Sequence, residues 1–233
     1  MSSVQLRIVD PDLADEARRI ATGLADDKVA SGIAAKDATL WGPDAESEAS
    51  VRLNWVDLGT SSRPLVARVA ELKSRLAATG VHRVVLAGMG GSSLAPEVIT
   101  GTAGVPLVVL DGTDPGQVQS ALDGGLDRTV LVVSSKSGGT VETDSQRRAF
   151  EKAFRDAGID PARRIVVVTD PGSPLEKTAA DAGYRAVFHA DPHVGGRYSA
   201  LTAFGLVPSG LAGADIGGLL DQAAEVADLL SAD

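Results

Sequence analysis

At 233 residues the chain can bury one α/β core with a helical appendage, and no apolar run in it approaches the length of a membrane span. Its formal charge of −9 argues against a nucleic-acid partner, because binding a phosphate backbone needs a basic face. The lack of cysteine and the presence of only three histidines argue against disulfides and a metal site, and residues 1–30 lack the order of a signal peptide, so we expect a cytoplasmic protein without a membrane partner.

The first 79 residues are predicted to form a helical lead-in. Residues 11–30 have the apolar spacing of a helix that begins near Asp10 or Pro11. Residues 64–79 have the pattern of a second amphipathic helix, which ends before a glycine. Residues 32–62 contain several glycines and serines, and we expect them to be mostly loop.

From residue 81 onward, short apolar runs alternate with helical patterns. The predicted strands are β-branched and bounded by Gly, Asp or Ser, and they span residues 83–87, 106–110, 129–133, 164–169 and 185–189. Helices are predicted at residues 93–100, 115–123, 140–157, 173–182, 197–206 and 215–231. Five successive strand–helix units predict an α/β fold with a doubly wound, flavodoxin-like, five-stranded parallel sheet. We expect this domain at residues 80–210 and a connecting helix at 211–233.

A glycine-rich loop, GMGGSS at Gly88–Ser93, follows the first predicted strand. Ligands of an open parallel sheet bind beyond the carboxyl ends of its strands. The glycines let the backbone approach a ligand, and the next helix points its unpaired N–H groups at that position. We therefore predict an anion pocket here. The alternative is a glycine-rich turn in which a serine caps the helix.

A second loop, SSKSGGT at Ser134–Thr140, follows the third predicted strand and precedes a long helix. A phosphate could accept several charge-assisted hydrogen bonds from its hydroxyl and N–H groups, each worth ~1.5–3 kcal/mol. The alternative is that Thr140 caps the helix and the serines only belong to a turn. Because two such loops lie at the same edge of the sheet, we favour a phosphate pocket.

A dinucleotide-binding fold is the main competing interpretation. Gly88 and Gly90 fit the first two glycines of G-x-G-x-x-G, and Asp111 follows about 20 residues further on. The third glycine position is Ser93, however, where close helix packing requires a smaller residue, and that fold has no use for the second loop. The sequence contains no Walker A motif.

A third loop, VGGRYS at Val194–Ser199, follows the fifth predicted strand. Two glycines place Arg197 at the start of a predicted helix, at the same edge of the sheet as the other loops. An arginine there can neutralise a phosphate or an oxyanion that develops during a reaction. The alternative is an exposed arginine in a surface ion pair.

Taken in order, the three loops resemble the motifs of the phosphoglucose isomerase family. The family pattern G-[IM]-G-G-S-x-L-x-P is matched at Gly88–Pro96, S-K-[ST]-x-x-T-x-E-T at Ser135–Thr143, and G-G-R-[FY]-S at Gly195–Ser199. The resemblance covers about residues 80–210, which correspond to the family's first sugar-isomerase (SIS) domain. The Ser-Gly-Gly form of the second motif is similar to the bacterial branch that includes transaldolase fusions.

The resemblance implies roles for individual positions. Those that match the family's phosphate-binding positions are Ser92, Ser135, Ser137 and Thr140, with Gly91 and Lys136 contributing loop backbone. Arg197 matches the arginine that stabilises the enediolate intermediate. The implied ligand is a sugar 6-phosphate. The implied reaction is the isomerisation of glucose 6-phosphate and fructose 6-phosphate through a cis-enediol, with no metal and no organic cofactor.

The family's enzymes are much longer than this chain, and their second half supplies the glutamate that moves the proton between C1 and C2. We therefore expect the chain alone to bind sugar phosphate weakly and to isomerise it negligibly. The resemblance implies a homodimer or a separate second SIS half as partner. Two other functions stay open: a sugar-phosphate-binding SIS module without catalysis, and an NAD(P)-binding oxidoreductase domain.

Overall fold

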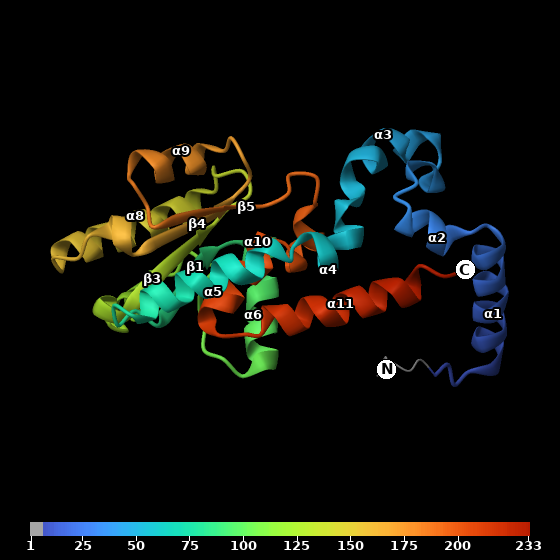
Figure 1. The fold of residues 1–233 in the computed structure, drawn as a ribbon, viewed down its shortest axis with the longest axis horizontal. Helices are drawn as coiled ribbons and strands as arrows, with labels where there is room; N and C mark the ends of the chain where they lie inside the picture. The colour runs from blue at the N-terminus through green and yellow to red at the C-terminus, as the bar shows by residue number, and fades with distance from the viewer. Residues whose placement is uncertain (1–6) are drawn as a thin grey trace.

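The computed structural model describes residues 7–233 and shows an α/β fold with one parallel sheet (Figure 1). Its five strands lie in the order β2-β1-β3-β4-β5. They are β1 (Arg83–Gly88), β2 (Val108–Leu110), β3 (Thr129–Ser134), β4 (Ile165–Thr169) and β5 (Ala186–His189). The predicted five-stranded, doubly wound sheet is confirmed, and this order is the flavodoxin-like one, in which the direction of winding reverses between β1 and β3.

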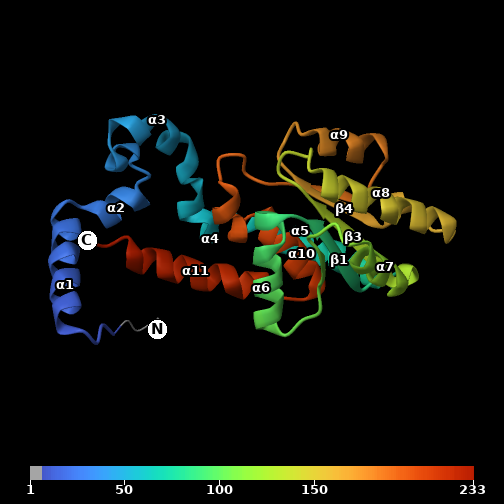
Figure 2. The same ribbon diagram turned by 180° about the vertical axis from the view of Figure 1, so that it is seen from behind.

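Helices cover both faces of the sheet (Figures 1 and 2). One face packs against α7, α8 and α9, and the other packs against α5 and α10, which in turn contact α6 and α11. The helices are α5 (Pro64–Ala77), α6 (Leu94–Ala103), α7 (Pro115–Asp123), α8 (Val141–Asp156), α9 (Pro174–Asp181), α10 (Ala203–Ala212) and α11 (Ile216–Leu230). The short 3₁₀ helices in this part are η3 (Gly90–Ser92), η4 (Leu126–Arg128), η5 (Pro161–Arg163) and η6 (Gly196–Leu201).

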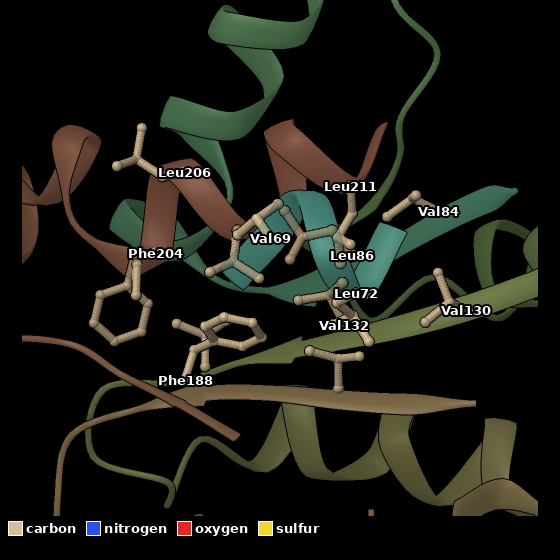
Figure 3. Close-up of a cluster of buried hydrophobic side chains, with 14 of the residues drawn as sticks. Val69, Leu72, Val84, Leu86, Val130, Val132, Phe188, Phe204, Leu206 and Leu211 are labelled. Carbon is tan, nitrogen blue, oxygen red and sulfur yellow. The ribbon is translucent and has the colours of Figure 1, made fainter. Parts of the chain in front are cut away.

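The three central strands are buried on both faces, which explains their continuous apolar sequences. Side chains of a strand alternate between its faces. On β1, Val84 and Leu86 therefore face α5 and α10, whereas Val85 and Ala87 face α8. Figure 3 shows the first of these clusters, in which Leu86 packs with residues of α5 and α10. Burial on both faces fixes the register of β1 against β3, because a one-residue slip would exchange the two sets.

The N-terminal part is helical throughout most of its length, and the prediction that residues 32–62 are mostly loop is wrong. Its elements are α1 (Pro11–Asp26), α2 (Val29–Ala34), η1 (Ala38–Trp41), α3 (Pro43–Arg52), η2 (Leu53–Asp57) and α4 (Leu58–Ser61). Gly42, at φ +83°, precedes Pro43 at the first position of α3, where a proline loses no hydrogen bond. The glycines and prolines of this segment separate short helices instead of excluding them.

The connection after β5 also differs from the prediction of one helix at residues 197–206. The chain forms η6 first, and α10 begins after Thr202, whose hydroxyl accepts a hydrogen bond from the Phe204 N–H at 3.2 Å. From α10 the chain continues into α11, which runs toward α1 and α2 (Figures 1 and 2). Asp233 accepts a hydrogen bond from the Ser31 N–H at 3.0 Å. No helix within residues 7–233 has the length and apolar character needed to cross a membrane.

Candidate functional site

A pocket of about 420 Å³ lies beyond the carboxyl ends of β1 and β3, where the strand order reverses. Gly88 and Ser134, the last residues of these strands, are paired in the sheet, so the two loops begin side by side. An open α/β sheet binds its ligands in this crevice. All six residues predicted to surround the phosphate line this one pocket: Gly91, Ser92, Ser135, Lys136, Ser137 and Thr140.

The two helices that begin at the pocket lack side-chain caps. Ser93 precedes α6 and Thr140 precedes α8, and neither hydroxyl accepts a hydrogen bond from its helix. By contrast, α7, α9 and α10, which also follow strands, are capped by Asp114, Ser173 and Thr202. The alternatives in which Ser93 or Thr140 caps a helix are therefore wrong. The first N–H groups of α6 and α8 stay available to an acceptor, and the helix dipoles favour an anion there.

The hydroxyl groups of the second loop are held by hydrogen bonds within that loop. Ser135 Oγ lies 3.2 Å from Thr140 Oγ1 and accepts a hydrogen bond from the Gly138 N–H at 3.2 Å. Ser137 Oγ accepts a hydrogen bond from the Gly139 N–H at 3.2 Å. Ser137 Oγ is only an acceptor in its contact, so its O–H remains able to donate to a ligand. In the Ser135–Thr140 contact one hydroxyl donates to the other, so one O–H of this pair remains for a ligand. The loop thus presents ordered donors to the pocket.

Gly91 brings the first loop into contact with the third. A Cβ at position 91 would lie 2.5 Å from the carbonyl oxygen of Gly196, which is closer than such atoms approach. Ser199 strengthens this junction, because its Oγ lies 2.6 Å from the Gly196 oxygen and 3.3 Å from the Gly91 oxygen. Because Gly91 has no side chain, the first and third loops touch, and together they form one wall of the pocket.

Lys136 lines the pocket, but its ammonium group is engaged by protein atoms. Its Nζ lies 2.8 Å from Asp170 Oδ2 and 3.2 Å from the carbonyl oxygens of Pro192 and Val194. An ammonium group has three N–H donors, so these three acceptors occupy all of them. The side chain therefore connects the second loop to the segment before Arg197.

Arg197 is not among the residues that line the pocket, although its neighbours Gly196 and Ser199 are. The side chain is exposed, and within residues 7–233 it has neither a hydrogen-bond nor an ion-pair partner. The alternative of an arginine held in a surface ion pair is thus not seen in the described part of the chain. Its guanidinium group is not committed to any protein acceptor among these residues.

Six further residues line the pocket that were not assigned to the phosphate. Met89, Ser134, Gly196 and Ser199 lie within the three predicted loops, whereas Asp170 and Phe204 lie outside them. Ser134 Oγ and Asp170 Oδ1 are buried and have no hydrogen-bond partner within the described residues. Buried polar atoms are costly to leave unpaired, so each is open to a bound group or a water: Ser134 Oγ can donate or accept, and the carboxylate oxygen of Asp170 can accept. Asp170 directly follows β4, and inspection of the residue after every predicted strand would have found it.

A larger groove of about 960 Å³ lies between α1, α2 and α11, but its lining is mostly Ala, Leu, Val and Ile side chains. Such a surface offers a phosphate neither cations nor hydrogen-bond donors in number, so this groove does not suit an anionic ligand. Among residues 7–233, no three His, Asp or Glu side chains gather as a metal ion would require. The smaller pocket is therefore the candidate site for an anion.

The strand order and the two uncapped helices define a doubly wound α/β domain with an anion-binding pocket at its switch point. A family model described as phosphoglucose isomerase matches residues 67–228. The chain belongs to the phosphoglucose isomerase family.

Curated relatives that the chain matches are named glucose-6-phosphate isomerase. The chain is 38% identical over 160 residues to the glucose-6-phosphate isomerase of a Cyanothece species, a match that covers 63% of this chain and 30% of the relative. It is 40% identical over 152 residues to the probable glucose-6-phosphate isomerase of Haloarcula marismortui, covering 64% of this chain and 35% of the relative. The match thus spans about a third of these relatives.

Solved structures agree in fold. A hypothetical protein from Thermus thermophilus superposes with a TM-score of 0.74 at 29% identity, covering 92% of this chain and 50% of that one. A glucose-6-phosphate isomerase from Chlamydia trachomatis superposes with a TM-score of 0.65 at 27% identity, covering 85% of this chain and 38% of that one. The family match and the strand order, which differs from the dinucleotide-binding order 3-2-1-4-5-6, both oppose the NAD(P)-binding interpretation.

Proposed function

We propose that this chain is the phosphate-binding part of a glucose-6-phosphate isomerase. The pocket holds the 6-phosphate of glucose 6-phosphate or fructose 6-phosphate through the hydroxyls of Ser92, Ser135, Ser137 and Thr140 and through loop N–H groups that include Gly91. The observation that carries this proposal is that α6 and α8, alone among the five helices that follow the strands, begin at one hydroxyl-lined pocket without side-chain caps. An acceptor with several oxygens satisfies such an arrangement.

The reacting carbons of the sugar extend from the phosphate toward the rim, where Arg197 stabilises the negative charge of the cis-enediolate. Its neighbours Gly196 and Ser199 line the pocket, which supports this placement. Moving a proton between C1 and C2 also needs a base within hydrogen-bond reach. Asp170 is the one carboxylate among the lining residues, and Lys136 engages it. The base accordingly comes from a second SIS half or a partner subunit.

This function implies a division of the chain. Residues 1–79 are the helical lead-in, residues 80–210 are the SIS domain that binds the sugar phosphate, and residues 211–233 connect it to a second SIS half. The family match at residues 67–228 supports the central part of this division.

Ligand-dependent thermal stability tests the proposal. Fructose 6-phosphate should raise the melting temperature of the chain, because a ligand that binds only the folded state stabilises it. Fructose lacks the phosphate and NAD lacks the sugar 6-phosphate, so neither should raise it at the same concentration. Equal stabilisation by fructose would show that the phosphate contributes nothing to binding in the pocket. Stabilisation by NAD alone would favour the dinucleotide-binding interpretation.

Substitution of the loop hydroxyls locates the site. Ser137→Ala and Thr140→Ala should each weaken the binding of fructose 6-phosphate by ~1–2 kcal/mol, because each removes one hydrogen bond to a charged group. Calorimetry measures the change. Ser74→Ala, at an exposed serine of α5, is the matched control and should bind as the unmodified chain does. Unchanged affinity in both loop variants would show that this loop does not bind the phosphate.

A second candidate function is a sugar-phosphate-binding module without catalysis. The observation that favours it is that Asp170, the one carboxylate among the lining residues, is held in an ion pair with Lys136 through Oδ2. The two candidates differ in Arg197, which a module that only binds phosphate does not need. Loss of affinity for an enediolate mimic in Arg197→Ala would favour the isomerase.

A further inference from the structure

Residues 191–198 form the connection between β5 and η6 and its first turn, and we call them the arginine segment because they carry Arg197. One side of this segment is held by the second loop. Lys136 Nζ donates to the carbonyl oxygens of Pro192 and Val194, at 3.2 Å each, and Asp170 holds the same ammonium group at 2.8 Å. The second loop is thereby tied to the arginine segment.

The other side is held by η2 and the end of α3, in the N-terminal part whose role the sequence left open. Arg52 Nη1 donates to the Pro192 carbonyl oxygen at 3.1 Å, so this oxygen receives hydrogen bonds from both sides. Asn54 Nδ2 donates to Asp191 Oδ2 at 2.7 Å. These two bonds join residues that are about 140 positions apart in the chain.

Trp55 makes the contact nearest to Arg197. Its ring is stacked on that of Tyr198, with centroids 5.3 Å apart and an angle of 19° between the planes. Tyr198 is 53% exposed and adjoins Arg197 in the chain. Offset stacking of this kind is worth more than the apolar area it buries and fixes the relative orientation of the rings. Trp55 therefore restricts the backbone that carries Arg197.

The position of Arg197 depends on such neighbours, because within residues 7–233 its own side chain has no protein partner. Electrostatic stabilisation of an oxyanion depends on a donor that is already in place when the charge develops. We propose that Trp55 is a positioning residue for Arg197 that acts through the stacked Tyr198, while Lys136 holds the preceding part of the arginine segment. This inference rests on the proposed function, since it presupposes that Arg197 meets a developing anion.

Trp55 also lines the apolar groove together with Leu201 and residues of α11, so a test must separate positioning from packing. Two ligands make this separation. Sorbitol 6-phosphate offers a phosphate without a carboxylate, whereas a five-carbon aldonic acid 5-phosphate adds a carboxylate that imitates the charge of an enediolate. The ratio of their dissociation constants, measured by calorimetry on the 233-residue chain, reports Arg197 separately from the phosphate site.

The unmodified chain should prefer the aldonic acid phosphate by about tenfold or more, and Arg197→Ala should abolish this preference. Trp55→Leu fills most of the volume without an aromatic face and should also abolish most of the preference, while its affinity for sorbitol 6-phosphate stays within about twofold. Trp55→Phe keeps a stacking ring and should restore the preference. Trp41→Leu is the matched control, at an exposed tryptophan of η1, and should behave as the unmodified chain.

A double-variant cycle completes the test, because residues that act through one another are not additive. Trp55→Leu should cause no further loss of preference in the Arg197→Ala background. An unchanged preference in Trp55→Leu, or an equal loss in both backgrounds, would overturn the positioning role and leave the proposed function intact. Failure of the unmodified chain to bind sorbitol 6-phosphate would instead overturn the proposed function, and the positioning role with it.

Discussion

At the scale of single residues, the site depends as much on missing side chains as on the hydroxyls that line it. Gly91 allows the first and third loops to touch, since a Cβ there would meet the Gly196 carbonyl oxygen at 2.5 Å. Lys136 shows the opposite case, because the ammonium group of this motif residue is bound by Asp170 and two carbonyl oxygens. A motif identifies which residues matter, but the direction of a side chain depends on what surrounds it.

We expect Gly91→Ala to open the pocket. The added methyl group must push the two loops apart, which lowers the free energy of unfolding by ~1–3 kcal/mol and weakens the binding of fructose 6-phosphate. Urea unfolding and calorimetry measure the two effects. Gly101→Ala in α6 is the control, because a Cβ there meets nothing within 4 Å. A Gly91→Ala chain with unchanged stability and affinity would mean that the loops do not touch in solution.

At the scale of elements, α8 is anchored so that its first turn reaches the pocket. Arg147 and Glu151 of α8 form an ion pair at 3.2 Å, and the Tyr184 hydroxyl lies 2.7 Å from Arg147 Nη1 and donates to Glu151 Oε1 at 2.6 Å. All three residues are buried. This network ties the middle of α8 to the segment just before β5, on the face of the sheet opposite α5 and α10.

The network predicts a loss of stability at high pH. Burial, followed by the hydrogen bond to Glu151, raises the pKa of Tyr184 to about 12 from 10.0. The folded state therefore holds this proton more tightly than the unfolded state, so the stabilisation is complete below pH 10 and is lost as the pH rises toward 12. Unfolding free energies of the unmodified chain and of Tyr184→Phe should differ by a constant amount below pH 10, and the difference should shrink above it. A difference that stays constant up to pH 12 would contradict the shift.

At the scale of the whole molecule, the pocket is built from segments that lie far apart in the sequence. The N-terminal helices reach across to the arginine segment, and α11 runs back toward α1 and α2 (Figure 1). The matched relatives are about three times longer than the matched region. Residues outside the matched region can therefore contribute to the site in these relatives. We therefore expect binding and catalysis to separate in this chain.

The 233-residue chain should bind fructose 6-phosphate without converting it to glucose 6-phosphate at a measurable rate. Proton transfer needs a base, and the one carboxylate among the lining residues is engaged by Lys136. A coupled assay that reports glucose 6-phosphate measures the rate on the purified chain. Turnover that disappears in Asp170→Asn would identify Asp170 as the base, and turnover that survives this change would place the base elsewhere in the chain.

The sequence alone determined the sheet, the loops and the family, because each has a local cause. Strands buried on both faces must be apolar throughout, and a loop that approaches a ligand must be small, so both can be recognised without knowledge of their neighbours. The short helices of residues 32–62 were missed, since their glycines and prolines mark helix ends as readily as loops. Only the tertiary structure decided that Asp170 pairs with Lys136 and that Trp55 stacks on Tyr198, because packing alone brings together residues so distant in the chain.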